Sequence, residues 1–298
     1  MSCAKIRLDG ATKMRDAIKY CRDIITSLGA ESCFVNCGNA QIHYARSGTG
    51  DAVVLLHGFG AWAYGWRNQI TALRDEFRLL AVDLKGFGLS TRSLRTSYSV
   101  EAHAEAVMYV LEHEGIERAV IVGNSFGGTV GLTMAALFPE RVKALILLGA
   151  PFRIELPKLP PLLFVPLIGP KLAEWKLFNE EGVEDVMRFN YANHSIITEE
   201  AIKSYLAPLR IRGTAYAWAK MLRQIDGFDL SQRLSQVTQP SLLIWGELDK
   251  TVPIQVGVEL QTRLKGAHMR VLRDIGHAPH EECPQLVNEL MREFIAAV

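Results

Sequence analysis

Short apolar runs recur along the chain from Ala52 onward, and they are continuous rather than alternating with polar residues. Strands buried on both faces have this pattern, as in a parallel sheet covered by helices. Segments of helical length separate the runs, which predicts an α/β fold with a doubly wound, mostly parallel sheet. The runs are Ala52–Leu56, Leu79–Val82, Ala119–Val122, Val142–Leu148 and Leu242–Trp245, and the helical segments are Asn68–Glu76, Ser99–Glu114, Phe126–Phe138 and Gln285–Ala297.

The N-terminal part of the chain has a different pattern. Apolar residues at steps of three and four predict an amphipathic helix over Ala11–Leu28, with Gly29 suited to end it. Lys and Arg on the other face would allow contact with a membrane surface, but packing of the apolar stripe on the domain is favoured. Two strand-like segments follow, Ser32–Asn36 and Gln41–Arg46.

The alternation of strands and helices stops between about Pro151 and Gln239. This region opens with six prolines, the last of them Pro170, and then shows helical patterns at Lys171–Phe178, Val183–Asn190, Glu199–Leu209 and Tyr216–Ile225. Such a block between two strands is an insertion that should sit over one edge of the sheet. The sequence thus predicts an N-terminal extension (residues 1–31), a core in two parts (residues 32–150 and 240–298) and a helical insertion (residues 151–239).

Composition excludes several classes of protein. The 298 residues are 49% apolar and carry a net charge of +1, which is typical of a globular protein and gives no electrostatic footprint for nucleic acid. Five cysteines are an odd and sparse set that indicates no disulfide framework, and Cys33 and Cys37 lack a second Cys/His pair at metal-binding spacing. No apolar stretch has the length of a signal-peptide core at the N-terminus or of a bilayer span elsewhere. We therefore expect a soluble, cytoplasmic protein.

The strongest chemical signal is the segment Gly123-Asn124-Ser125-Phe126-Gly127, which fits the pattern G-x-S-x-G. A strand-like run precedes it and a helix-like segment follows it, the context of a nucleophile on a tight strand-to-helix turn. The serine oxygen then projects at the carboxyl ends of the strands, where open α/β sheets bind ligands. A serine standing by chance in a glycine-rich turn would lack this context, so Ser125 is the candidate nucleophile.

A serine nucleophile requires a base and a group that orients the base, in the chain order Ser, acid, His for this type of turn. Asp249 follows the buried run Leu242–Trp245, and His277 follows a glycine in a loop before the last helix. Both therefore occur in the expected order. Glu247 and His280 are the weaker alternatives for acid and base.

The tetrahedral intermediate requires two preorganised N–H donors. The sequence predicts that they are the backbone N–H of Phe126 and that of Phe59, in the loop after the first buried run. Aromatic residues after this loop and in the insertion predict an apolar substrate pocket, although the same spacings also suit core packing. The candidate pocket residues are Trp62, Trp66, Phe152 and Trp218.

From about Ser32 to the C-terminus, the chain resembles the α/β-hydrolase superfamily. The matching pieces, in the family's order, are His57–Gly60, Asp83–Ser90, the Ser125 turn, Trp245-Gly246 with Asp249 and Pro253, and Gly276-His277. The resemblance implies a Ser-His-Asp triad, a helical cap made by the insertion, a structural role for Asp83, and no metal or organic cofactor. Relatives that form an alkyl-enzyme use aspartate as nucleophile, so serine at position 125 disfavours their chemistry.

Three functions remain open. The first is hydrolysis of a carboxylic ester of a fairly hydrophobic small molecule through an acyl-enzyme. The second is carbon–carbon bond hydrolysis of a vinylogous diketone, because Asn124 resembles the G-N-S turn of that subgroup. Those enzymes usually carry tryptophan after the catalytic histidine, where this chain has Ala278, and a cap arginine, for which Arg188, Arg210 and Arg212 are candidates. The third is a ligand receptor that retains the triad but turns over slowly.

Overall fold

The computed structural model describes residues 10–156 and 168–298, so the start of the chain and most of the proline-rich opening of the insertion lie outside the described residues. Among the described residues, eight strands form one sheet in the order β1-β2-β4-β3-β5-β6-β9-β10. The strands are β1 (Glu31–Cys37), β2 (Ala40–Ser47), β3 (Ala52–Leu56), β4 (Arg78–Val82), β5 (Ala119–Asn124), β6 (Val142–Leu148), β9 (Ser241–Gly246) and β10 (His268–Leu272).

The six strands from β4 to β10 in this order are parallel, whereas β1 and β2 form an antiparallel hairpin that pairs with β4. The register places Leu56 of β3 beside Gly123 of β5, and Asn124 of β5 beside Leu148 of β6. The loops after β3, β5 and β6 therefore leave the sheet at the same edge. This edge is where an open α/β sheet binds ligands.

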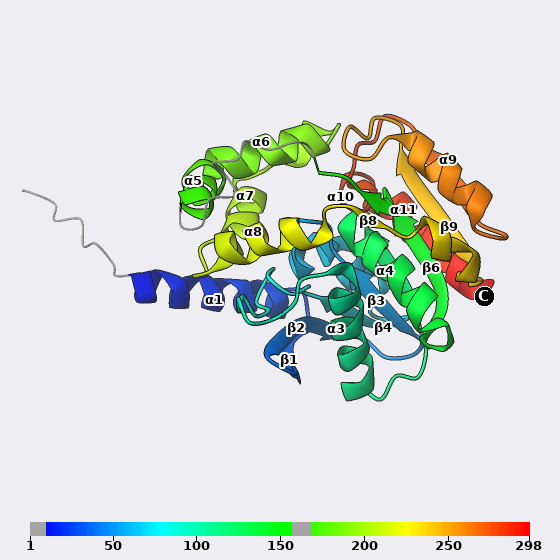
Figure 1. The fold of residues 1–298 in the computed structure, drawn as a ribbon, viewed down its shortest axis with the longest axis horizontal. Helices are drawn as coiled ribbons and strands as arrows, with labels where there is room; N and C mark the ends of the chain where they lie inside the picture. Colours follow the sequence, from blue (N-terminus) through cyan, green and yellow to red (C-terminus); the bar gives the residue numbers. More distant parts are fainter. Residues whose placement is uncertain (1–9, 157–167) are drawn as a thin grey trace, which may run out of the picture.

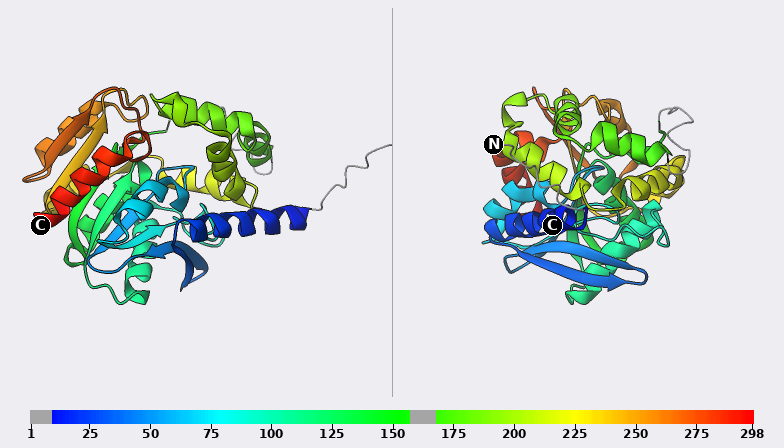
Figure 2. Two further views of the ribbon diagram at one scale, coloured as in Figure 1. Left: turned by 180° about the vertical axis from the view of Figure 1, so that it is seen from behind. Right: turned by 90° about the vertical axis from the view of Figure 1, so that its left-hand side faces the viewer.

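Helices cover both faces of the sheet, as the continuous apolar runs predict. Val54 and Leu56 of β3 lie in one core cluster with α3, α4 and α9, while Val53 and Leu55 lie in a second cluster with α1, α2 and α11. Figure 1 shows α3 and α4 in front of the sheet, and the reverse view in Figure 2 brings α11 to the front. The helices outside the insertion are α1 (Gly10–Ser27), α2 (Arg67–Leu73), α3 (Val100–His113), α4 (Phe126–Leu137), α9 (Ile254–Arg263), α10 (Pro279–Glu282) and α11 (Pro284–Ala296).

Helix α1 packs its apolar stripe on the rest of the protein. Cys21 and Ile25 are fully buried, and the helix contacts α7 and β1. The N-terminal end of α1 extends away from the body (Figure 1). Within the described part of the chain, no helix combines the length and the apolar character required to cross a membrane.

The insertion between β6 and β9 contains the four helices that the sequence predicts, grouped at one end of the sheet (Figures 1 and 2). The side chains of Asn179 and Thr198 accept hydrogen bonds from the backbone N–H of Gly182 and Ala201, which explains where two of the helices begin. The insertion comprises β7 (Arg153–Ile154), α5 (Ile168–Leu177), α6 (Glu180–Asn190), α7 (Glu199–Leu209), α8 (Thr214–Ile225) and β8 (Phe228–Asp229), and β7 pairs with β8.

His103 of α3 is an unusual core residue. Its side chain is fully buried, and neither ring nitrogen has a hydrogen-bond partner among the described residues. The ring packs edge-on against Phe126, with 5.1 Å between the ring centroids. Burial, aided by the nearby charge of Lys85, holds the pKa of His103 well below its usual value. Because the folded protein excludes this proton and the unfolded chain binds it, His103 destabilises the fold increasingly as the pH falls below about 6.5.

We predict that His103→Leu raises the free energy of unfolding by about 1–3 kcal/mol at pH 7, because it removes two unpaired buried polar atoms. The gain should be larger at pH 5, where unfolding of the wild type takes up a proton at His103. Urea denaturation at both pH values measures this, with His113→Leu on the exposed side of the same helix as control. A loss of stability in His103→Leu, equal at both pH values, would show that the imidazole makes favourable contacts.

Candidate active site

Ser125 stands in the strained turn that the sequence predicts between β5 and α4. Its backbone angles are φ 51° and ψ −121°, a region that costs a non-glycine residue about 1–3 kcal/mol. The turn is tight on both sides: a Cβ at Gly123 would lie 2.5 Å from Gly127 O, and one at Gly127 would lie 2.2 Å from Leu56 O. The N–H of Ser125 donates to Leu148 O at 2.8 Å, which holds the turn against the end of β6.

His277 and Asp249 form a hydrogen-bonded pair at the same edge of the sheet. The distance from His277 Nδ1 to Asp249 Oδ2 is 2.7 Å, and both side chains are almost completely buried. The other oxygen of Asp249 accepts hydrogen bonds from the N–H groups of Thr251 and Val252, each at 2.8 Å. A carboxylate bound in this way assigns the proton to Nδ1 and leaves Nε2 of His277 available as a base.

The end of β6 brings this pair and Ser125 together. A Cβ at Gly149 would lie 2.9 Å from Asp249 Oδ2 and 3.1 Å from His277 Nδ1, so the pair packs directly on the strand that also holds Ser125. The side-chain amide of Asn124 donates to Leu148 O at 3.2 Å and to His277 O at 3.0 Å. Asn124 therefore connects the turn that carries Ser125 to the loop that carries His277.

The loop after β3 lies against Ser125. A Cβ at Gly58 would be 3.2 Å from Ser125 Cβ, so the residue before Phe59 packs on the candidate nucleophile. Buried His57 fixes this loop, because its Nε2 accepts the N–H of Leu84 at 3.0 Å and its Nδ1 donates to Gly58 O at 2.8 Å. Burial lowers the pKa of His57 and keeps the ring in this neutral form. Phe126 is the first residue of α4, so its N–H has no acceptor within the helix.

Asp83 has the contacts of a structural residue. One carboxylate oxygen accepts the N–H of Ala63 at 2.7 Å, and the other accepts from His43 Nδ1 at 2.6 Å and from Leu89 N–H at 2.8 Å. Burial would raise the pKa of this carboxyl group, but the neighbouring His43 outweighs it and holds the pKa of Asp83 below its usual range. Asp83 thereby connects the loops after β3 and β4.

The two weaker candidates for acid and base have other surroundings. His280 is buried, with its ring centroid 4.3 Å from that of Trp66, and burial lowers its pKa to about 4. The carboxylate of Glu247 is exposed and accepts only the N–H of Asp274, at 3.3 Å, among the described residues. The geometry therefore favours His277 and Asp249.

Three of the four expected pocket residues lie in the core instead. Trp62, Trp66 and Phe152 have no exposed surface and so line no open pocket, and the indole N–H of Trp62 donates to Ser204 O. Trp218 of α8 is instead only partly buried and contacts the candidate oxyanion loop. Its ring lies 4.9 Å from that of Phe59 between centroids, and its N–H donates to Gly86 O at 3.1 Å.

The sequence gives no sign of two residues that hold the candidate base in place, Asn190 and Glu282. The N–H of His277 donates to Asn190 O at 2.7 Å, and Asn190 Oδ1 accepts the hydroxyl of Thr251 at 2.7 Å. The end of α6 therefore contacts both the histidine loop and the aspartate loop.

Glu282 completes this connection. One of its oxygens accepts the N–H groups of Gly276 and Ala278, on either side of His277, at 3.0 and 3.4 Å. The other accepts those of Ala192 and Asn193 in the insertion, at 2.8 and 3.0 Å. A single buried carboxylate thus joins the histidine loop to the insertion.

A second buried carboxylate, Glu281, joins the insertion to the core. It accepts the hydroxyls of Tyr191 and Tyr205, each at 2.7 Å, and forms an ion pair with Arg67 of α2 at 2.5 Å. Burial would raise the pKa of Glu281, but Arg67 outweighs it and lowers that pKa. Burial, followed by the charge of Glu281, raises the pKa of both tyrosines well above the usual value, so they remain donors.

A family model described as the alpha/beta hydrolase fold matches residues 51–284. The chain belongs to the α/β-hydrolase family. In this α/β hydrolase, the described residues include no group of three or more His, Cys, Asp or Glu side chains that could hold a metal ion.

Several relatives of this α/β hydrolase are also hydrolases. The chain is 31% identical to the uncharacterized hydrolase YugF of Bacillus subtilis, over 85% of this chain and 92% of that protein. It is 32% identical to a 2-hydroxy-6-oxononadienedioate/2-hydroxy-6-oxononatrienedioate hydrolase of Burkholderia vietnamiensis, over 91% and 98%. The crystal structure of a meta-cleavage product hydrolase from Pseudomonas fluorescens has the same fold, with a TM-score of 0.77 at 24% identity, over 89% of this chain and 97% of that one.

We predict that Glu282→Gln lowers kcat for p-nitrophenyl butanoate roughly 10- to 100-fold. Four backbone N–H groups donate to the two oxygens of Glu282, whereas an amide has only one acceptor oxygen, so the loop that carries His277 should shift. KM should change much less. Steady-state kinetics measure both, with Glu289→Gln on an exposed position of α11 as control. If the melting temperature fell in Glu282→Gln while kcat stayed within twofold, Glu282 would be only a structural link.

Proposed function

We propose that this chain is a serine hydrolase that cleaves a carboxylic ester of a fairly hydrophobic small molecule. Ser125 is the nucleophile, His277 the general base and Asp249 the residue that orients the base. The observation that carries the proposal is the 2.7 Å hydrogen bond between His277 and Asp249. The two side chains pack on the end of β6, and the N–H of Ser125 in the strained turn is bonded to the same end of that strand.

The reaction follows from these positions. Nε2 of His277 accepts the hydroxyl proton of Ser125 while the serine oxygen attacks the ester carbonyl, and the imidazolium is stabilised by Asp249. The N–H groups of Phe59 and Phe126 bind the oxyanion, each worth about 3 kcal/mol in such sites. The tetrahedral intermediate collapses, His277 gives the proton to the leaving alcohol, and an acyl-enzyme remains. Water activated by His277 then releases the acid.

Two aromatic residues support a preference for apolar acyl or aryl groups. Phe59 is 38% exposed although it belongs to the candidate oxyanion loop, and its ring packs against Trp218 of the insertion. An exposed phenyl ring on the candidate oxyanion loop offers apolar contact to the substrate.

Carbon–carbon bond hydrolysis is the second candidate, favoured by Asn124 and by the names of relatives such as the Burkholderia enzyme. Two features of this chain count against it. Ala278 follows the candidate base, and two of the three candidate cap arginines have other surroundings: Arg188 pairs with Glu184 of its own helix, and Arg212 lines a pocket that no candidate catalytic residue lines. The side-chain amide of Asn124 already donates to Leu148 O and His277 O, so its presence has a structural explanation.

We predict multiple turnovers on p-nitrophenyl esters, with kcat/KM rising from acetate to butanoate and octanoate. The vinylogous diketone 2-hydroxy-6-oxo-6-phenylhexa-2,4-dienoate should be cleaved at least about 100-fold less efficiently, because Ala278 stands where that subgroup carries tryptophan and Arg188 is paired with Glu184. Ser125→Ala should lower kcat by about 10⁶-fold while the protein stays folded. Faster cleavage of the diketone than of any ester would favour the second candidate. A single turnover with persistently bound product would favour a receptor.

A further inference from the structure

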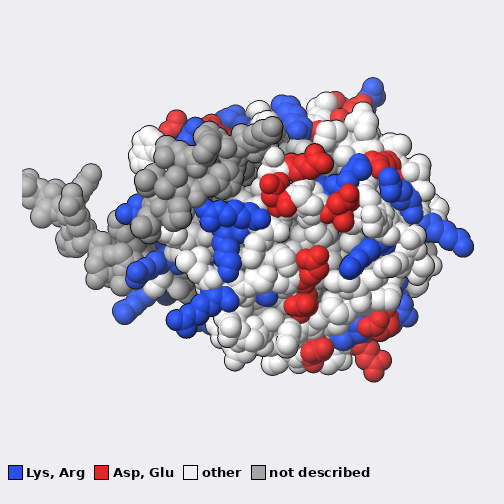
Figure 3. Space-filling model, viewed as in Figure 1, with Lys and Arg blue, Asp and Glu red and all other residues white. Residues whose placement is uncertain are grey.

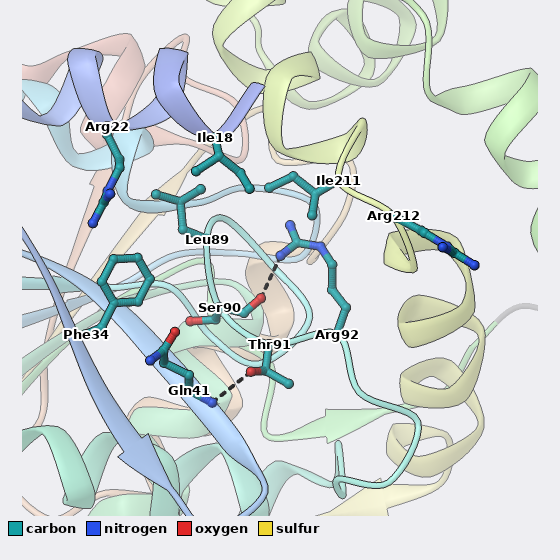
Figure 4. Close-up of a pocket in the computed structure, with 10 residues that line it drawn as sticks. All are labelled: Ile18, Arg22, Phe34, Gln41, Leu89, Ser90, Thr91, Arg92, Ile211 and Arg212. Carbon is teal, nitrogen blue, oxygen red and sulfur yellow. Dashed lines mark hydrogen bonds between the residues drawn. The ribbon is translucent and has the colours of Figure 1, made fainter. Parts of the chain in front are cut away.

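An open pocket of about 670 Å³ lies between α1, the loop after β4 and the turn between α7 and α8 (Figure 4). We call it the α1 pocket. None of the residues that line it belongs to the candidate triad or to the candidate oxyanion loop, so it is separate from the proposed active site. Its volume lies in the range of roughly 300–1,000 Å³ that is typical of small-molecule sites.

The walls of the α1 pocket carry positive charge without a matching acid. Arg22, Arg92 and Arg212 line it, and no Asp or Glu does. Arg22 and Arg212 are exposed and form no ion pair with any described residue. In Figure 3, Lys and Arg side chains gather around the end of the molecule where α1 lies. All the charged side chains that line this pocket are therefore cations.

Arg92 is the most confined of these arginines. Its guanidinium donates only to uncharged acceptors among the described residues: the backbone carbonyls of Ser90, Gly88 and Pro208 and the hydroxyl of Thr214. Burial lowers the pKa of Arg92 to about 10, so the group stays charged at neutral pH. Arg92 forms no ion pair with a described residue, although the charge of Asp83 partly offsets the effect of burial. Its four hydrogen bonds leave one of the five guanidinium N–H donors for a ligand, so Arg92 adds positive charge to the pocket more than it adds donors.

Apolar side chains form another part of the pocket, beside the polar residues Gln41, Ser90 and Thr91. Ile18 of α1, Leu89 and Ile211 are only partly buried, and Figure 4 shows their side chains next to one another. The guanidinium of Arg22 lies over the ring of Phe34, 5.2 Å from its centroid. The α1 pocket therefore combines a hydrocarbon surface with a positive rim, and each part would bind a different part of one ligand.

We propose that the α1 pocket binds a free anionic amphiphile, a monocarboxylate with an alkyl or aryl tail. The carboxylate binds at Arg22, and the tail lies on Ile18, Leu89 and Ile211, toward Arg92 on the other side of the pocket. This ligand contacts α1, the core and the insertion at once, and Arg92 connects it to the first residue of α8, the helix that carries Trp218. The proposal does not depend on the reaction at Ser125.

Calorimetric titration with decanoate, below the concentration at which it forms micelles, tests the proposal on the full chain. Arg22→Glu should weaken binding at least tenfold, or remove one of two sites if decanoate also enters the active site. Arg15→Glu is the matched control, because Arg15 is exposed on the same helix and does not line the pocket, and it should change binding less than twofold. The uncharged analogue decanol should bind at least tenfold more weakly at this site.

Equal decanoate binding by the wild type and Arg22→Glu, or no binding by the wild type at millimolar concentration, would overturn the proposal. The same positive surface could instead contact a membrane, and sedimentation with phosphatidylglycerol vesicles tests this alternative. If Arg22→Glu lost vesicle binding while the wild type bound no free decanoate, the surface around α1 would be a membrane contact and the proposal would be wrong.

Discussion

The candidate site depends on the backbone of Ser125, which is held at positive φ although the residue is not a glycine. The strain is maintained because the turn is fixed on both sides: Ser125 N–H is bonded to the end of β6, and the backbone packs so closely at Gly123 and Gly127 that neither position has room for a Cβ. The parallel arrangement of the strands then determines which loops lie next to this turn. Since the loops after β3, β5, β6 and β9 leave one edge of the sheet, the candidate oxyanion loop, the candidate nucleophile and the candidate acid–base pair meet there.

The insertion contributes to this site more directly than a simple cover would. Its helix α6 ends at Asn190, whose carbonyl and side chain bond to the loops of His277 and Asp249, and Glu282 adds four further backbone contacts. Movement of α6 would therefore move the candidate base. Glu281, with its two tyrosines and Arg67, makes such movement costly, because separation would leave a buried carboxylate without partners.

The sequence predicts the fold well because the signals are local. Continuous apolar runs mark the buried strands, and periodic apolar positions mark α3, α4 and the helices of the insertion, with α7 found at Glu199–Leu209 as predicted. Helix α9 (Ile254–Arg263) was not predicted. The candidate triad and oxyanion residues were found through their order and their strand-to-helix context, and their roles stay predictions.

Other features depend on contacts that no local pattern encodes. The aromatic spacing of Trp62, Trp66 and Phe152 suits a pocket and a core equally, and the fold buries all three. The role of Glu282 requires Ala192 and Asn193, far away in the chain, to reach its carboxylate. The α1 pocket forms only where the N-terminal helix meets the turn between α7 and α8.

The central claim is that Ser125 is activated by His277. Intact-mass measurement of the rate of labelling by a fluorophosphonate probe tests it most directly, on the wild type, Ser125→Ala, His277→Gln and His280→Gln. We predict one adduct on the wild type, none on Ser125→Ala, a rate at least about 100-fold lower for His277→Gln, and a rate within a few-fold of wild type for His280→Gln. Labelling of Ser125→Ala at the wild-type rate, or a loss of labelling confined to His280→Gln, would contradict the account.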